Sequence, residues 1–179
     1  MIWDDRPRTD FGRLRAVRSG EGPRLLLLHG VGLRAEAWNR QIDGMSETFE
    51  VIAPDMPGHG HSSFDGVAEI LSAYTDRIAE AIDEPIFVAG HSMGALIALD
   101  LAIRYPQRVA AVAGLNMIFR RSLEAAQAVQ ARASDLSMSK HADPNPTLLR
   151  WFGDLDLPEA KACRRWLSTV NPGAYKQAY

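Results

Sequence analysis

The chain has 179 residues, of which 46% are hydrophobic and 23% are charged, as is usual for one soluble globular domain. Its formal net charge is −2, which excludes a strongly basic surface for nucleic acid or an anionic membrane. Arginines recur from Arg6 to Arg18, but acidic and apolar residues interrupt them, so we interpret this stretch as a solvated face.

Cys163 is the single cysteine, so no disulfide can form within the chain, which favours a reducing compartment and a cytoplasmic location. Its helical context predicts a buried structural thiol. The neighbouring arginines could still lower its pKa, which leaves a catalytic role open. The N-terminus lacks the pattern of a signal peptide, and the apolar runs are too short to span a membrane.

Residues 1–119 alternate between strand-like and helix-like patterns. A weak alternation at 13–17 predicts an edge strand. Short apolar runs predict buried strands at 25–28, 49–53, 85–89 and 108–115, with helices between them at 34–47, 67–82 and 92–104. This order predicts an α/β fold with a doubly wound, mostly parallel sheet and right-handed crossovers.

The rest of the chain contains no convincing strand. Helical patterns cover 121–136, 146–152, 158–169 and 172–179. Pro158 and Pro172 stand where a first helical residue is expected, and Asn171 can cap the last helix. We therefore divide the chain into an incomplete α/β core at 1–119 and a helical lid or cap at 120–179.

Gly90-His91-Ser92-Met93-Gly94 matches the pattern G-x-S-x-G. It follows a predicted strand and opens a predicted helix, which is the setting of a nucleophile elbow. Gly90 and Gly94 would remove side chains that collide with neighbouring backbone, and the helix N-terminus would direct N–H groups at the site. The chemistry predicted is nucleophilic attack by Ser92. The alternative is a glycine-rich turn with an inert serine.

Gly30-Val31-Gly32 follows the strand predicted at 25–28. Acyl transfer needs two N–H donors aimed at the developing oxyanion. We expect these donors to be the backbone amides of Met93 and Val31, with Gly30 shaping the loop. Taken alone, the same residues would also fit an ordinary strand-to-helix turn.

Three successive motifs then resemble those of the α/β-hydrolase superfamily: Leu28-His29-Gly30-Val31-Gly32 with Trp38, residues 55–62 (DMPGHGHS), and the elbow at 90–94. The similarity covers residues 12–119 and lies with the serine esterase and lactonase branch, such as 3-oxoadipate enol-lactonases and pimeloyl-ester carboxylesterases. It implies hydrolysis of a small-molecule ester, thioester or lactone through an acyl-enzyme, with no cofactor and no metal. A serine at position 92 argues against haloalkane dehalogenase chemistry.

In that family the triad acid and histidine follow later strands, in the order serine, acid, histidine. Here no strand is predicted after Leu115, so neither is expected in this chain. We expect a truncated form with little or no turnover and an open sheet edge that favours self-association. The remaining histidines are interpreted as structural or solvated: His29, His59, His61, His91 (pointing away from Ser92) and His141, the only histidine after the serine.

Two other functions fit the same residues. One is a non-catalytic module that binds a small molecule, and the other is cofactor-free peroxide or oxygen chemistry on the same fold. Apolar residues of the lid indicate either an apolar pocket or packing onto the core: Leu149, Trp151, Phe152, Trp166 and Leu167.

Overall fold

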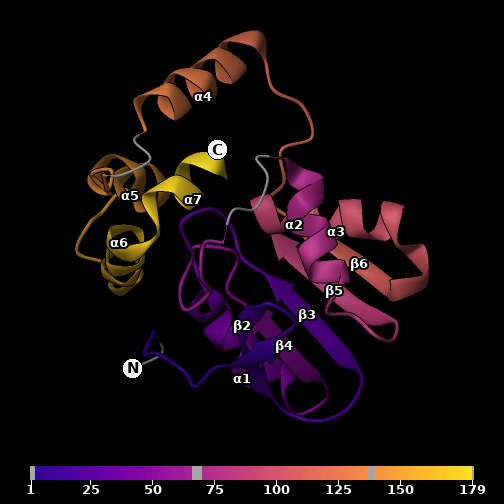
Figure 1. Ribbon diagram of the computed structural model, residues 1–179. Helices are drawn as coiled ribbons and strands as arrows, with labels where there is room; N and C mark the ends of the chain where they lie inside the picture. Colours follow the sequence, from indigo (N-terminus) through magenta and orange to yellow (C-terminus); the bar gives the residue numbers. More distant parts are fainter. Residues whose placement is uncertain (1–2, 66–69, 137–139, 179) are drawn as a thin grey trace.

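The computed structural model describes residues 3–65, 70–136 and 140–178, and it contains one six-stranded sheet with the order β1-β2-β4-β3-β5-β6 (Figure 1). The strands are β1 (Thr9–Phe11), β2 (Leu14–Ser19), β3 (Arg24–Leu28), β4 (Glu50–Pro54), β5 (Ile86–His91) and β6 (Val109–Leu115). The pairs β4–β3, β3–β5 and β5–β6 are parallel, whereas β1–β2 and β2–β4 are antiparallel. The doubly wound, mostly parallel fold is thereby confirmed.

The helices of the core are α1 (Asn39–Met45), α2 (Leu71–Ala79) and α3 (Met93–Arg104), with short 3-10 turns at Ala35–Trp38 and Pro106–Arg108. The remaining helices are α4 (Leu123–Asp135), α5 (Asn145–Phe152), α6 (Pro158–Thr169) and α7 (Pro172–Gln177). Pro158 and Pro172 stand in the first turns of α6 and α7, and Asn171 caps α7 by accepting the N–H of Ala174, as predicted. Part of the helix expected at 67–82 falls outside the described residues.

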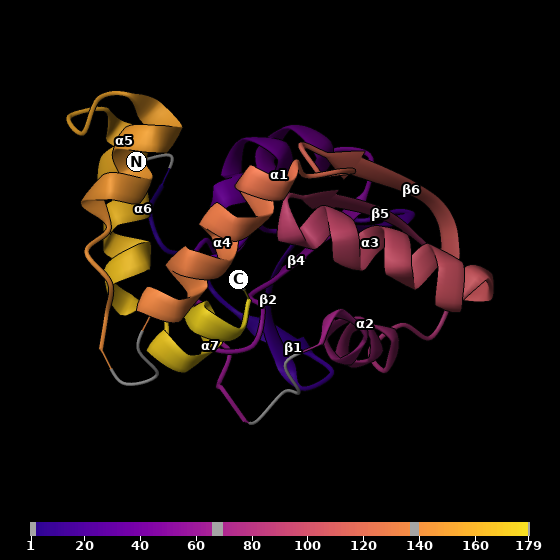
Figure 2. The ribbon, with the colours of Figure 1, turned by 90° about the horizontal axis from the view of Figure 1, so that it is seen from above.

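Side chains of the central strands alternate between two apolar layers, which is why both faces carry helices. Leu26 and Leu28 of β3 point into the layer that α2 and α3 cover. Leu25 and Leu27 point into the opposite layer, which α1 and Trp38 cover. Figure 2 shows α2 and α3 side by side. The continuous apolar run of β3 thus follows from burial on both faces.

The expectation of an edge strand at 13–17 was wrong. Residues 14–17 belong to β2, which lies inside the sheet between β1 and β4. The edge is β1, which has only three residues and pairs with β2 through Thr9 and Ala16 among others. A strand this short has too few positions for a visible alternation.

The helices α4–α7 lie together at one end of the sheet (Figure 1). Apolar side chains of α5, α6 and α7, with Leu136 after α4, pack on one another and on Val31, Leu33 and Ala37, which follow β3. Asn171 also donates its N–H to the carbonyl of Gly58 at 2.9 Å. The helical segment is therefore fixed over the loops that follow β3 and β4. None of the described helices is both long and apolar enough to cross a membrane.

The strand β6 is the far edge of the sheet, and its residues from Ala110 to Leu115 are exposed. Val112 is 38% exposed and Leu115 is 46% exposed, although both belong to a parallel strand. Parallel strands are normally covered on both faces, and an open apolar edge is a template for another strand. This arrangement fits the expectation that the edge favours self-association.

We therefore predict that the chain self-associates through β6 in a concentration-dependent way. Val112→Lys should shift the sedimentation profile toward monomer, because a charge on an edge strand opposes pairing. Ile103→Lys on α3, which changes a residue 77% exposed, is the matched control and should leave the profile unchanged. Equal effects of the two substitutions would show that general apolar surface, rather than the strand edge, drives association.

Candidate active site

Ser92 alone joins the end of β5 to the start of α3, and its backbone lies at φ 55° and ψ −116°. A residue other than glycine is destabilised by about 1–3 kcal/mol in such a backbone region, so the surrounding structure must hold Ser92 in this conformation. The N–H of Ser92 donates to the carbonyl of Leu115 at 3.0 Å, and its carbonyl accepts the N–H of Ala95 at 3.0 Å. The elbow is therefore anchored to both β6 and α3.

The two glycines of the motif allow backbone segments to touch. A Cβ on Gly90 would lie 2.0 Å from the carbonyl oxygen of Gly94, and a Cβ on Gly94 would lie 2.2 Å from the carbonyl oxygen of Leu28. Both distances are far inside van der Waals contact, so no other residue fits. The predicted reason for these glycines is confirmed, and it brings the start of α3 against the end of β3.

The turn after β3 lies directly beside the serine. A Cβ built on Gly30 would stand 3.2 Å from Cβ of Ser92, and the turn is closed by the N–H of Leu33, which donates to the carbonyl of Gly30 at 3.1 Å. Among the described residues, nothing accepts a hydrogen bond from the N–H of Val31. Met93 is the first residue of α3, where the helix leaves the N–H without a partner. Two candidate oxyanion donors thus flank Ser92.

Two buried histidines connect the loops after β3 and β4. Nε2 of His29 accepts the N–H of Met56 at 2.9 Å, and Nε2 of His59 accepts the N–H of Gly32 at 3.1 Å. Accepting an N–H requires a neutral ring with its proton on Nδ1. Burial lowers the pKa of His29, and burial with the nearby His29 ring lowers the pKa of His59 to about 3. Their structural interpretation is confirmed, and they hold the turn at Val31.

Arg8 is buried, which corrects the interpretation of the whole 6–18 stretch as a solvated face. Its guanidinium pairs with Glu36 at 2.7 Å and with Asp55 at 2.9 Å, and both carboxylates have no exposed surface. Burial lowers the pKa of Arg8, but the hydrogen bonds to Glu36 and Asp55 outweigh that effect and raise it. Asp55 also accepts the N–H of Ala35 and of His61, so both carboxylates serve the loops rather than Ser92.

Ser92 opens into a cavity of about 620 Å³ between the core and the helical segment. A neighbouring cavity of about 270 Å³ shares part of its wall but not Ser92. The larger cavity is lined by Gly30, Val31, Leu33, His91, Ser92, Asn116, Ile118, Arg121, Val129, Arg132, Arg150, Trp151, Phe152, Cys163 and Ala178. Trp151 and Phe152 support the expectation of apolar residues near the site, whereas Leu149 lines neither cavity.

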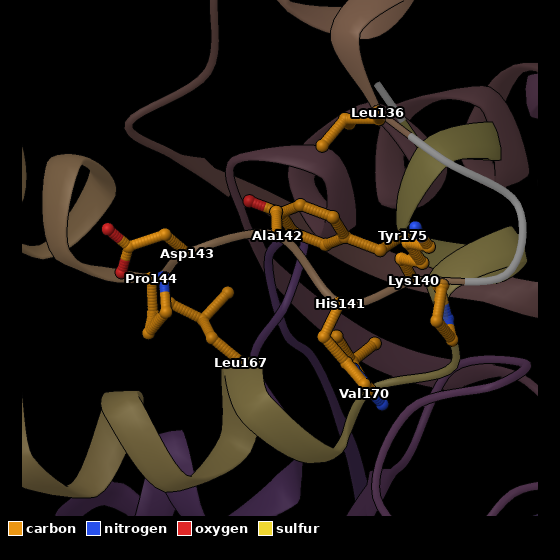
Figure 3. A pocket seen from close by; sticks show the side chains of 10 residues that line it. Leu136, Lys140, His141, Ala142, Asp143, Pro144, Leu167, Val170 and Tyr175 are labelled. Carbon is orange, nitrogen blue, oxygen red and sulfur yellow. The ribbon is translucent and has the colours of Figure 1, made fainter.

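His141 is not brought to Ser92. It lines a separate cavity of about 10 Å³ within the helical segment, where Figure 3 shows it near Val170. His61 is exposed and contacts Asp5. His91 is half-buried and lines both larger cavities, and burial lowers its pKa.

Cys163 is buried as predicted, and burial raises the pKa of its thiol to about 12, which disfavours the reactive thiolate. No group of metal-ligating side chains occurs in residues 3–65, 70–136 and 140–178.

Sequence reasoning missed Asn116, which directly follows β6 and lines the cavity beside Ser92. Its φ of 54° is left-handed, a conformation that asparagine tolerates better than most residues. The signal was present in the sequence, since a polar residue after a parallel strand lies at the edge where such sheets bind ligands. The arginines of the cavity carry no comparable local signal.

Comparison with known proteins places this geometry in context. The profile of the family described as "Alpha/beta hydrolase family" matches residues 25–178. An (E)-2-((N-methylformamido)methylene)succinate hydrolase of Acinetobacter baylyi is 39% identical over 166 residues, covering 89% of this chain and 63% of the relative. A pimeloyl-[acyl-carrier protein] methyl ester esterase of Aeromonas hydrophila is 27% identical, covering 86% of this chain and 70% of the relative.

Solved structures show the same fold. An E-2-(acetamidomethylene)succinate hydrolase superimposes with a TM-score of 0.76 at 26% identity, covering 96% of this chain and 70% of that one. The enol-lactonase of Burkholderia xenovorans superimposes with a TM-score of 0.77 at 23% identity, covering 96% of this chain and 71% of that one. The chain therefore spans about two thirds of the length of these proteins.

The buried histidines predict a specific loss of stability in acid. The unfolded chain protonates His59 near pH 6.5, the ordinary pKa of a solvated histidine, whereas the folded chain resists protonation down to about 3. The stabilising contribution is complete above pH 6.5 and is lost as pH falls toward 3. Between pH 7.5 and 5.5 it should fall by about 1.4 kcal/mol. Urea unfolding of the wild type and His59→Gln measures this, because groups that do not interact with His59 cancel in the difference. Parallel pH profiles would contradict it.

The backbone of Ser92 predicts an unusual order of stability among its variants. The free energy of unfolding of Ser92→Gly, measured with urea, should exceed that of Ser92→Ala by about 1 kcal/mol. Glycine relieves the strain of the positive φ, although it costs some chain entropy. Ser168 in α6 provides the matched pair, and there alanine should be the more stable substitution. If alanine is also favoured at position 92, the elbow is not strained.

Proposed function

The chain belongs to the alpha/beta hydrolase family, and we propose that Ser92 is the nucleophile of a hydrolase acting on carboxylic esters, thioesters or lactones. The observation that carries this proposal is that Ser92, which has a positive φ, lines the same cavity as Val31. Relatives named as a succinate-derivative hydrolase, a methyl ester esterase and an enol-lactonase support the same class of reaction.

The proposed reaction begins when Oγ of Ser92 attacks the carbonyl carbon of the substrate. The carbonyl oxygen becomes an oxyanion, which the N–H groups of Val31 and Met93 stabilise. The bond to the alcohol or thiol group then breaks as this group receives the proton taken from Ser92, and the acyl group stays on Ser92 until water releases it as a carboxylic acid. Both steps need a base that takes the proton of the attacking group.

We further propose that this 179-residue chain lacks that base and its acid partner. The described part of the larger cavity contains one histidine, His91, and no carboxylate. His91 adjoins the nucleophile in the chain, and we assign it no catalytic role. The chain covers 63% of the length of its Acinetobacter relative. Losing the histidine of such a triad lowers turnover by on the order of 10⁶.

The test combines covalent labelling with chemical rescue. A neutral fluorophosphonate should add one label to the chain by mass spectrometry, at a low rate, and Ser92→Ala should abolish it while Ser63→Ala, at an exposed serine, should not. Release of p-nitrophenol from p-nitrophenyl acetate should be slow, and added imidazole should raise it by replacing the missing base. Because imidazole itself cleaves this ester, only the excess over Ser92→Ala counts.

Each alternative gives a distinct result. Equal rates with and without Ser92 would contradict the nucleophile. Tight small-molecule binding without labelling would favour a binding module, and peroxide-dependent halogenation or peracid formation would favour oxygen chemistry. Fast turnover without imidazole would contradict the absence of a base while leaving the nucleophile in place.

A further inference from the structure

We propose that the lid side of the Ser92 cavity binds a carboxylate of the substrate through Arg121, Arg132 and Arg150, an inference that rests on the proposed function. The three arginines line the cavity of about 620 Å³ that also holds Ser92. They come from different elements: Arg121 precedes α4, Arg132 lies in its last turn, and Arg150 lies on α5. Separate segments of the lid thus place positive charge around one space.

The charges of Arg121 and Arg150 are not neutralised by the described residues of the wall, whereas Arg132 has an interaction of its own. None of the described residues that line the cavity is acidic. Within the described ranges, the side chains of Arg121 and Arg150 form no ion pair or hydrogen bond. The guanidinium of the neighbouring Arg120 lies over the ring of Phe119 instead. Arg121 and Arg150 are exposed residues that an anion can reach from solvent, in contrast to the buried guanidinium of Arg8, which pairs with Glu36 and Asp55.

The chemistry of the wall suits a carboxylate on an apolar stem. A guanidinium group presents N–H donors in a planar fork that matches a carboxylate, and several such groups repel one another until an anion lies between them. Val129, Trp151 and Phe152 line the same cavity and supply apolar surface. A short acyl compound with an apolar stem and one or two carboxylates satisfies both kinds of surface.

The neighbouring cavity sets the direction in which such a substrate lies. Its wall includes three tryptophans and Glu159, and no arginine or lysine among the described residues. It shares five residues with the first cavity: Gly30, Leu33, His91, Phe152 and Cys163. Glu159 repels an anion, and the tryptophans favour a neutral group. The carboxylate is thus directed to the arginines, and the neutral part of the substrate to the aromatic cavity, with Ser92 beside the carbonyl carbon.

Calorimetric titration of the full chain with succinate, a small dicarboxylate, tests this assignment at fixed ionic strength. We expect saturable binding of succinate and no measurable binding of its neutral analogue succinamide. The double variant Arg121→Gln/Arg150→Gln should raise the dissociation constant at least tenfold. Arg120→Gln, next in sequence but outside the cavity wall, is the matched control and should change it less than twofold.

Several outcomes would overturn the proposal. They are a dissociation constant for succinate that is unchanged in the double variant, an equal loss of succinate affinity in Arg120→Gln, and binding of inorganic phosphate but not of succinate. Circular dichroism verifies that each variant is folded, and the single variants Arg121→Gln and Arg150→Gln should each weaken binding severalfold. Labelling of Ser92 by the neutral fluorophosphonate does not depend on the arginines, so failure of this proposal and failure of the hydrolase proposal remain distinguishable.

Discussion

The close approach of α3 to the ends of β3 and β5 is the constraint on which the site depends. Gly94 lies so near the carbonyl of Leu28 that a single methyl group would separate the helix from the strand. This contact brings Ser92 and the first N–H of α3 against the turn after β3. The glycines therefore do more than permit an unusual turn: they set the distance between Ser92 and the turn at Val31.

A second layer of buried polar contacts keeps that loop in place without a ligand. His29 and His59 tie the segments after β3 and β4 to each other, and Asp55 accepts the N–H of Ala35 while it pairs with Arg8. Every one of these groups is buried, so each unmade hydrogen bond would carry a desolvation cost. Such fully satisfied networks specify one loop conformation more strongly than apolar packing would. Rigid donors are what oxyanion stabilisation requires.

The sequence predicts features that depend on neighbours along the chain. Apolar runs located β3–β6, prolines and Asn171 located the starts of α6 and α7, and the motif at 90–94 located the elbow. Contacts between distant residues leave no such pattern. Arg8 reaches Asp55 across 47 positions, and its exposed neighbours in the 6–18 stretch concealed that burial. The arginines of the cavity were missed for the same reason, because tertiary structure alone places Arg121 and Arg150 in the wall of one cavity.

The features that the sequence predicts and those that it does not also differ in their proposed chemical role. The groups proposed to act on the carbonyl lie in the core: Ser92 at the elbow, and the amides of Val31 and Met93 at the ends of regular elements. Their geometry follows from glycines and backbone, so it tolerates little variation. The groups assigned to the substrate lie on α4, α5 and the segment before them, where side-chain identity can change without disturbing the sheet. A fold that fixes its chemistry in backbone contacts and its selectivity in lid side chains can acquire new substrates while keeping the same reaction.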